Sequence, residues 1–297
     1  MYYYVVNPAA GRGQIRNLQT KIRSRLDELG IRGEWAKTTG PGEATRMTKA
    51  AVASGNYSTI VAVGGDDTVN EVINAVDQPN VAVGVIPLGN TNRLATQLGI
   101  VTWPQACEAL AARRLTSYSL IAAGQKYFLS TLTIGFETDL DKNVDTSETG
   151  WRARTRQFGQ SFGQARHYPN LGCHIDVDGR YQLECSFFTL TIANQKFLNP
   201  LADNRLIVSI SNHPGRNLGL GRFVWQTLRD RSNSRLDAPT TRFLATRVVI
   251  ETEPATGITV DGKVAGRTPI AIRLTDRRIR LITEKIIADF KDAVSQP

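Results

Sequence analysis

Cysteine and histidine are scarce in this chain of 297 residues, which contains three of each. The three cysteines are Cys107, Cys173 and Cys185, and no two of them show CxxC spacing. Their odd number and their spacing argue against a disulfide framework or a zinc site, so we expect three packed thiols in a reducing cytoplasm. The three histidines also lack the close spacing of metal ligands.

Long apolar runs and several common catalytic motifs are absent as well. No run approaches the ~20 residues of a membrane-spanning helix, and residues 1–6 lack the basic segment that opens a signal peptide. Neither GxxxxGK(S/T) nor GxSxG occurs, and Arg16 stands where a dinucleotide fingerprint beginning at Gly11 needs its third glycine. These absences argue against a transmembrane segment, a P-loop and a hydrolase elbow, and they leave a Rossmann NAD site poorly supported.

Positive charge is in excess, with a net charge of +9 and a sequence pI of about 9.7. This balance favours anionic partners, namely phospholipid headgroups, nucleotides or nucleic acid. Nucleic acid is the weakest of the three because no nucleic-acid-binding module is recognisable. Arginines gather at residues 113–114, 152–156 and 277–280. A solvated face is the simplest interpretation of any single cluster.

The cluster at residues 152–156 has aromatic neighbours, which are Trp151, Phe158, Phe162 and Tyr168. Arginine mixed with aromatic residues suits an anionic membrane surface, to which a peripheral protein binds at the inner face. The same pattern suits an amphipathic helix that packs on its own domain. The sequence leaves both interpretations open.

Strand and helix patterns alternate up to residue 116. We expect strands at residues 2–6, 33–36, 59–63 and 81–86, with helices between them. This alternation predicts the α/β fold class, with an N-terminal parallel sheet that carries helices on both faces. Ligands of such a sheet bind beyond the carboxyl ends of its strands.

Glycine turns follow three of these strands, at Gly11, at Gly64 with Gly65, and at Gly89. Because parallel strands end at the same edge of a sheet, we expect the three turns to converge. We expect them to lie in a cleft between this domain, residues 1–116, and a second one.

Short strands separated by turn signals such as Asp178-Gly179 fill residues 117–283. This pattern predicts a C-terminal β-sandwich-like domain. Its expected strands include residues 127–134, 185–193, 269–274 and 279–283, whereas residues 239–241 suggest a loop.

The most informative segment is Gly64-Gly65-Asp66-Asp67-Thr68-Val69-Asn70-Glu71, which directly follows an apolar run. This order predicts a buried strand, a tight turn and a helix start. Thr68 and Glu71 have the spacing of a capping box with Thr68 as N-cap. A helix N-terminus at the end of a strand binds anions through its free N–H groups, yet Asp67 places a carboxylate where a phosphate is expected.

This segment resembles the GGDGT phosphate loop of the diacylglycerol kinase and sphingosine kinase superfamily, which includes bacterial YegS-like lipid kinases. Three other segments resemble that family in the same order. Residues 7–13 are similar to its NPxxG turn, residues 87–95 to its PLGTxNDFA segment and residues 260–263 to its DGE motif. The resemblance implies that a last helix, residues 284–297, returns to the first domain.

The resemblance also implies a function, which is phosphoryl transfer from ATP, with Mg²⁺, to the hydroxyl of a lipid. It makes residues 1–116 the nucleotide-binding domain and residues 117–283 the lipid side. The residues that it implies for the nucleotide site are Asn7, Gly11, Arg12, Thr38, Thr39, Gly64, Gly65, Asp66, Asp67, Thr68, Asn70, Glu71, Gly89, Asn90 and Asn92.

Several positions depart from the family pattern. Asp67 replaces a glycine, Asn90 and Arg93 replace a threonine and an aspartate, and Ser119 stands where family members often carry an aspartate. Because those aspartates belong to the family's metal and water network, the resemblance leaves Asp66 as the main metal ligand. Asp203, in a shortened form of the family's structural metal loop, is a second candidate.

Lys263 replaces the glutamate that accepts the hydroxyl proton in the family. A lysine is protonated near neutral pH and is no base unless its pKa falls strongly, so Asp261 is the substitute candidate. Asp67 can repel the phosphates, bind a metal ion, or pair with Arg12 or Arg93, and the sequence leaves these outcomes open.

Two hypotheses follow for the function. The first is an ATP-dependent lipid kinase with altered activity. The second is a catalytically silent relative, a pseudokinase that binds nucleotide or anionic lipid in a regulatory role. The sequence also leaves a homodimer open.

Overall fold

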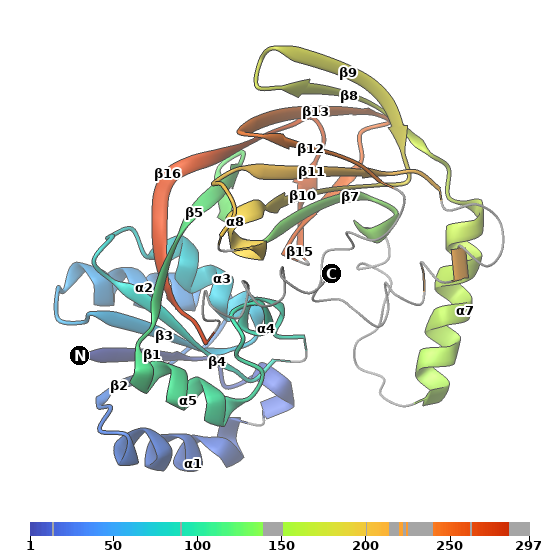
Figure 1. The fold of residues 1–297 in the computed structure, drawn as a ribbon. Coiled ribbons are helices and arrows are strands. Elements are labelled where there is room, and N and C mark those ends of the chain that lie inside the picture. The colour runs from blue at the N-terminus through green and yellow to red at the C-terminus, as the bar shows by residue number, and fades with distance from the viewer. Residues whose placement is uncertain are drawn as a thin grey trace, which may run out of the picture. The chain divides into compact units, whose positions relative to one another are not determined.

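The computed structural model describes residues 1–13, 15–89, 91–138, 151–199, 201–213, 220–221, 224, 240–261 and 263–284 (Figure 1). The chain divides into two compact units. Unit 1 takes its described residues from Met1–Leu120, Asn199–Leu201 and Thr275–Pro297, and unit 2 from Ile121–Leu198 and Ala202–Leu274. The helix expected at residues 284–297 lies outside the described residues beyond Glu284.

Unit 1 is built on a parallel sheet. Strand β1 (Tyr2–Val6) lies between β2 (Gly33–Lys37) and β3 (Thr59–Gly64), and β4 (Ala82–Pro87) pairs with β3. The last part of β16 (Ile270–Ile282) adds a further parallel strand beside β4. Every residue of β3 and β4 is buried, as expected for apolar strands covered on both faces. The predicted parallel sheet is therefore confirmed.

Helices cover both faces of this sheet. Figure 1 shows α2 and α3 on one face of unit 1, and α1 and α5 on the other. The helical elements of unit 1 are η1 (Ala10–Gly13), α1 (Ile15–Glu28), α2 (Glu43–Ala53), α3 (Asp66–Ala75), α4 (Arg93–Gln97) and α5 (Trp103–Ala112). In α1 the buried residues Ile15, Ile22 and Leu26 recur at helical spacing and form the face toward the core.

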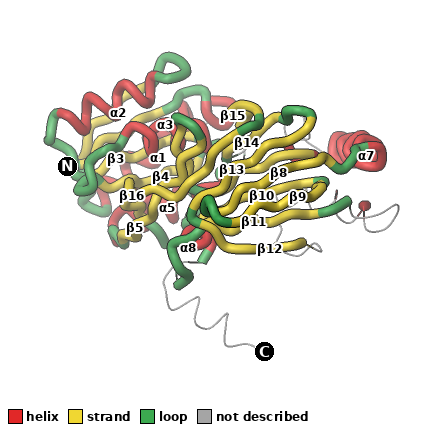
Figure 2. The backbone as a smooth tube through the Cα atoms, turned by 90° about the horizontal axis from the view of Figure 1, so that it is seen from above, coloured by secondary structure: helices red, strands yellow, loops and turns green. Residues whose placement is uncertain are grey.

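Unit 2 contains an antiparallel sheet in the order β12-β11-β10-β7-β14-β15. Its strands are β7 (Thr131–Gly135), β10 (Thr189–Asn194), β11 (Leu206–Ser211), β12 (Thr240–Ala245), β14 (Gly257–Val260) and β15 (Lys263–Arg267). Figure 2 shows β10, β11 and β12 side by side.

A second antiparallel layer of unit 2 joins β13 (Arg247–Glu253) to the start of β16 and to β8 (Leu171–Val177), which pairs with β9 (Tyr181–Phe187). Side chains of both layers share one core, which includes Ile175 of β8 and Ile192 of β10. The predicted β-rich second domain with sandwich-like packing agrees with this arrangement.

Helix α7 (Trp151–His167) carries the aromatic residues that the sequence analysis associated with a membrane or a domain surface. Phe158, Phe162 and Tyr168 pack against a small core of unit 2 that contains Phe136 and Phe188. These aromatic side chains therefore contact their own unit. The side chains of residues 151–155 lie outside the described part. Within the described residues, no helix is long and apolar enough to cross a membrane.

Two expected strands are divided in the structure. Residues 127–134 form β6 (Lys126–Phe128) and β7, and residues 185–193 belong to β9 and β10, with Phe188 between them. The second break occurs because the chain changes sheets at Phe188, whose N–H donates to the carbonyl of Ser211 at 2.8 Å. An unbroken apolar run hides such a change of partner.

Other expected boundaries were wrong in the opposite sense. Residues 269–274 and 279–283 belong to one strand, β16, which continues through the polar residues between them. In this stretch the hydroxyl of Thr275 donates to the carbonyl of Leu120 at 2.7 Å, so a polar side chain is accommodated in the strand. Residues 240 and 241, expected in a loop, begin β12, because they pair with Ser211 and Ile210 of β11.

Candidate functional site

The carboxyl ends of β3 and β4 are in direct backbone contact. A Cβ atom on Gly89 would lie 2.5 Å from the Cα of Gly65, and a Cβ on Gly65 would lie 3.2 Å from the Cα of Gly89. The N–H of Leu88 donates to the carbonyl of Gly64 at 2.9 Å and extends the strand ladder into the loops. Only glycine allows the two loops to approach this closely.

The loop after β1 reaches the same edge through Asn7. Its N–H donates to the carbonyl of Val63 at 2.9 Å, and its Nδ2 donates to the hydroxyl of Thr68 at 3.2 Å. Gly11 follows in η1 with φ 56°, a conformation that favours glycine. The structure therefore brings Asn7, Gly64 and Thr68 together. The side chain of Arg12 lies outside the described part.

Helix α3 begins at this edge without a side-chain cap. Its N-cap is Gly65, in an extended conformation, and Asp66 and Asp67 occupy its first turn. The prediction that Thr68 is the N-cap was wrong, because the chain is already helical from Asp66 onward and Thr68 is buried inside the first turn. The helix N-terminus, whose amide dipoles attract anions, thus has Gly65 at its tip.

The carboxylate of Asp66 holds the start of helix α4. It accepts hydrogen bonds from the hydroxyl of Thr91 at 2.8 Å and from the N–H groups of Arg93 at 3.0 Å and Leu94 at 3.1 Å. A carboxylate has about four lone-pair directions, so these bonds leave about one for another ligand. Asp66 is therefore a positioning group for the loop after β4 as well as a metal candidate.

Asn92 closes that loop with its side chain. Its Oδ1 accepts the N–H of Gly89 and its Nδ2 donates to the carbonyl of Gly89, both at 2.8 Å. The backbone of Asn92 is left-handed, with φ 46°, which asparagine tolerates in turns. Asn90 lies outside the described residues. Asn70 is half-buried in α3, and its carbonyl accepts a hydrogen bond from Asn74 at 2.9 Å.

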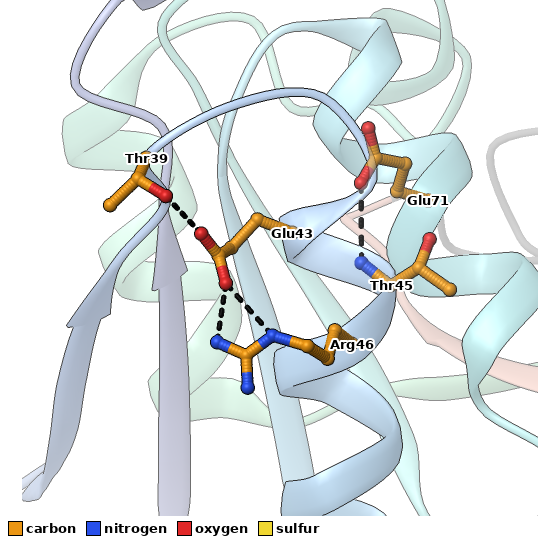
Figure 3. Close-up of polar contacts among 5 residues, drawn as sticks. All are labelled: Thr39, Glu43, Thr45, Arg46 and Glu71. Atoms are coloured by element: carbon orange, nitrogen blue, oxygen red, sulfur yellow. Dashed lines mark hydrogen bonds and ion pairs between the residues drawn. The ribbon is translucent and has the colours of Figure 1, made fainter.

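Glu71 caps helix α2 rather than its own helix. Its two carboxylate oxygens accept the N–H groups of Gly42 and Thr45, each at 3.2 Å, and Figure 3 shows the contact with Thr45. The predicted capping box with Thr68 was wrong because α2 packs beside α3 and offers Glu71 these uncapped amides. An internal carboxylate thus binds the α2 N-terminus, whereas no side chain caps the α3 N-terminus, which is therefore the candidate anion site of this edge.

The loop between β2 and α2 carries Thr38 and Thr39. Thr38 is buried, and its N–H donates to the carbonyl of Val6 at 2.8 Å. The hydroxyl of Thr39 donates to Glu43, which also accepts the Nε of Arg46 at 2.9 Å (Figure 3). Hydrogen bonds from Thr39 and then Arg46 lower the pKa of Glu43. Both threonines therefore form hydrogen bonds within the protein, one through its backbone and one through its side chain.

The remaining candidates belong to unit 2. Asp261 is buried with a left-handed backbone, and its Oδ1 accepts the N–H of Thr131 at 2.9 Å. Lys263 is exposed at the start of β15. Asp203 is exposed in a turn, where its carbonyl accepts the N–H of Arg205 at 3.0 Å. Among the described residues, no group of three or more His, Cys, Asp or Glu side chains gathers in a metal-binding arrangement.

Known proteins resemble this chain at the same loops. Residues 1–123 match the diacylglycerol kinase catalytic domain, and this match includes every candidate loop of unit 1. A diacylglycerol kinase from Bacillus subtilis is 35% identical over 197 residues, which is 64% of this chain and 64% of that protein. Over these residues the chain is similar to the diacylglycerol kinase superfamily, and it spans less than two thirds of the length of that relative.

Solved structures of this superfamily and its neighbours share the fold. A putative diacylglycerol kinase from Bacillus anthracis superposes with a TM-score of 0.74 over 95% of both chains, at 21% identity. An NAD kinase from Archaeoglobus fulgidus in complex with ATP superposes with a TM-score of 0.55 over 100% of both chains, at 14% identity. The combination of a parallel α/β unit and an antiparallel β unit is thus the fold of the diacylglycerol kinase superfamily.

The structure also shows a supporting residue that the sequence analysis had assigned to a solvated face. Arg277 of β16 donates to the carbonyls of Asn74 and Val76, at 2.9 and 2.8 Å, at the C-terminal end of α3. A cation there stabilises the helix whose N-terminus lies at the candidate site. Arg277 and its partners are far apart in sequence, so no local pattern in the sequence indicates the contact.

Proposed function

We propose that this protein binds the phosphates of ATP at the carboxyl edge of the unit 1 sheet and transfers the terminal phosphoryl group to the hydroxyl of a lipid. The observation that carries the proposal is the α3 N-terminus, which is uncapped by a side chain and preceded by a glycine contact that lets a ligand approach the backbone. The kinase relatives and the ATP complex of the NAD kinase support the choice of nucleotide.

In this proposal each unit 1 residue has a defined role. The N–H groups at the start of α3 bind phosphate oxygens, and Asn7 fixes Thr68 and the loop after β1 against that helix. Asp66 holds the loop after β4 in place. The unit 1 residue that would hold Mg²⁺ is Asp66, through its remaining lone pair, since Mg²⁺ usually binds through one or two carboxylates and keeps several waters. Bound Mg²⁺ neutralises phosphate charge.

The proton of the lipid hydroxyl needs an acceptor. A protonated lysine is no base at neutral pH, so Lys263 does not take this role in the proposal. We assign it to the Asp261 carboxylate, which Thr131 holds in one orientation. Asp261→Asn is then expected to lower transfer by about 10²–10⁴-fold, the usual contribution of a positioned base, and to leave ATP affinity unchanged.

A second function is favoured by the charge at two positions. Arg93 and Lys263 place cations where the family carries carboxylates, as the sequence comparison implies. A protein with these changes can bind nucleotide or anionic lipid and act as a regulatory partner without transferring phosphate. ATP binding is expected of the kinase and of a silent relative that binds nucleotide, whereas phosphoryl transfer is expected of the kinase alone.

The test combines two measurements on one preparation. Calorimetry measures ATP binding, and labelled ATP measures transfer to a panel of lipid hydroxyls that includes diacylglycerol, with magnesium and manganese tested separately. Binding with transfer supports the kinase function, and binding without transfer to any lipid of the panel supports the silent relative. If ATP binds neither with nor without metal, the kinase function and the nucleotide-binding form of the silent relative are both overturned. Gly172→Ala, also in unit 2, serves as the control substitution for Asp261→Asn, because its added methyl meets no atom within 4 Å.

A further inference from the structure

Two of the three cysteines face each other across a pair of strands. Cys173 of β8 is the direct cross-strand partner of Cys185 of β9, and their Sγ atoms lie 3.2 Å apart. From the sequence alone we expected three packed thiols without a disulfide. The third, Cys107, is buried in α5 of unit 1.

The cross-strand position has the geometry that a disulfide requires. Directly opposed residues of an antiparallel pair have Cα atoms about 4.5–5.5 Å apart, and disulfides join Cα atoms about 4.4–6.8 Å apart. Oxidation therefore needs rotation of the two side chains and no movement of the strands. Cysteines whose Cα atoms are more than about 7 Å apart, or whose Cβ vectors diverge, cannot be bridged without backbone movement.

The two thiols differ in access. Cys173 is 4% exposed and belongs to the core of unit 2, whereas Cys185 is only partly buried. In the part of the chain that the structure describes, β9 is the last strand in the order of its sheet. A small reagent that arrives from solvent thus meets Cys185 first, with Cys173 directly behind it.

We infer that Cys173 and Cys185 form a reversible thiol–disulfide site that reacts with low-molecular-weight disulfides of the glutathione type. Cys185 is the attacking thiol and Cys173 is the resolving thiol. This modification site is independent of the proposed kinase function, because it lies in β8 and β9 and uses none of the candidate nucleotide residues.

The reaction proceeds in two balanced exchanges. The Cys185 thiolate attacks one sulfur of oxidised glutathione, which forms a mixed disulfide and releases one reduced glutathione. Cys173 then attacks the Cys185 sulfur of the mixed disulfide, which forms the Cys173–Cys185 bond and releases the second glutathione. Two protein thiols are oxidised and one glutathione disulfide is reduced to two thiols.

The burial of Cys173 supports this order. Burial, followed by the contact with Cys185, raises the pKa of the Cys173 thiol to about 12. A buried neutral thiol is a slow first nucleophile toward a reagent in solvent. As the second nucleophile it gains from its fixed position beside the sulfur that it attacks.

The chain offers a direct test. The native protein is incubated with oxidised glutathione, its remaining thiols are blocked with N-ethylmaleimide, and it is digested with trypsin without reductant. Trypsin cleaves after Arg180, so Cys173 and Cys185 fall in separate peptides, residues 167–180 and 181–196. We expect these peptides to appear linked, and to separate again after dithiothreitol.

Three variants control this result. Cys107→Ser is expected to link like the parent, and both Cys173→Ser and Cys185→Ser to lose the linked species. Cys173→Ser is also expected to retain glutathione on Cys185, because no resolving thiol remains. Circular dichroism checks that each variant is folded.

Several results overturn the inference. One is linkage of the two peptides only after the protein is unfolded in urea. Another is glutathione that accumulates on Cys107 rather than on Cys185. The last is a folded parent whose two peptides are blocked by N-ethylmaleimide and are not linked. Phenylarsine oxide provides a measurement that needs no variant, since it bridges two adjacent thiols. One arsenical bound per native chain, at residues 167–196, supports the pair, and the absence of binding contradicts it.

Discussion

The two units of the molecule differ in what holds their candidate residues in place, which is backbone contact in unit 1 and single side chains in unit 2. In unit 1 the loops beyond β3 and β4 meet glycine to glycine, and helix starts are held by Asp66 and Glu71. In unit 2 the candidate chemistry rests on single side chains, a buried Asp261 and an exposed Lys263. We therefore expect the proposed nucleotide binding and the proposed proton transfer to respond to different substitutions, because different kinds of constraint hold the two sets of residues.

The largest effect on ATP binding is expected from Gly89→Ala, which tests the backbone constraint in unit 1. The added methyl would lie 2.5 Å from the Cα of Gly65, and overpacking of this kind costs about 1–3 kcal/mol. We expect the two loops to separate and ATP affinity to fall about ten-fold or more, which corresponds to about 1.4 kcal/mol. Calorimetry measures the affinity.

The matched control for Gly89→Ala is Gly172→Ala in unit 2, where the methyl meets no atom within 4 Å. Equal ATP affinity for the parent and Gly89→Ala would contradict the claim that the glycine contact shapes the phosphate site.

The next effect concerns Glu71 and the stability of unit 1. Glu71→Ala removes the carboxylate that accepts the N–H groups of Gly42 and Thr45. Loss of a helix cap costs about 0.5–2 kcal/mol, so amides of α2 should exchange faster with deuterium. Hydrogen exchange of unit 1 and unit 2 peptides measures this, with unit 2 unchanged. Glu71→Gln, which keeps one acceptor oxygen, should be intermediate, and equal protection in all three proteins would count against the cap.

Asp67 gives a smaller effect of opposite sign. A carboxylate ~4 Å from one phosphate charge costs about 1 kcal/mol in water and roughly 4 kcal/mol at an effective dielectric of 20. Asp67 is exposed, so we expect Asp67→Gly and Asp67→Asn to raise ATP affinity about five-fold, the equivalent of about 1 kcal/mol. The asparagine variant keeps the helix propensity that glycine lowers. A sharp, metal-dependent loss of affinity in calorimetry would instead identify Asp67 as a metal ligand.

Asp178 tests unit 2 by pH. Burial alone would raise the pKa of Asp178, but hydrogen bonds from Thr246 and Arg247 outweigh it and lower that pKa. A lowered folded pKa contributes stability above the unfolded value of about 3.9, and this contribution is lost as pH falls through the folded pKa. Hydrogen exchange of β13 should therefore speed up as pH falls below about 4, after correction for intrinsic rates. Asp178→Asn should lack this transition, and its persistence would contradict the assignment.

The smallest effect is expected at helix α7. Arg152, Arg154 and Arg156, replaced together by glutamine, should reduce co-sedimentation with phosphatidylglycerol vesicles, because each arginine near an anionic surface contributes on the order of 1 kcal/mol. Since Phe158 and Phe162 pack within unit 2, the binding should be electrostatic and should weaken as salt rises. ATP binding should be unchanged. If the triple variant and the parent sediment alike, the cluster is a solvated face.

Periodicity in the sequence predicted the strands that keep the same neighbouring elements along their whole length. Strands β3 and β4 of unit 1 are buried on both faces, so continuous apolar runs mark them. The change of sheet at Phe188 and the start of β12 at Thr240 depend on which strand pairs with them. Nothing in the local sequence specifies that partner.

The candidate site likewise contains contacts that the sequence predicted and contacts that it did not. Gly65 and Gly89 were predicted from turns after strands, and the structure places them in contact. The partner of Glu71 was not predicted, because Gly42 and Thr45 belong to another helix and become neighbours only when α2 packs on α3. The pairing of Cys173 with Cys185 likewise required the register of β8 and β9.

The contact between Gly65 and Gly89 has a consequence for how such proteins diverge. Neither glycine takes part in chemistry, so a mutation that abolishes phosphoryl transfer relieves no crowding between them. Folding alone therefore requires both glycines, since a side chain at either position would crowd the other loop. Asp67, which is exposed, is not confined in this way, so its charge can change while the contact between the loops persists.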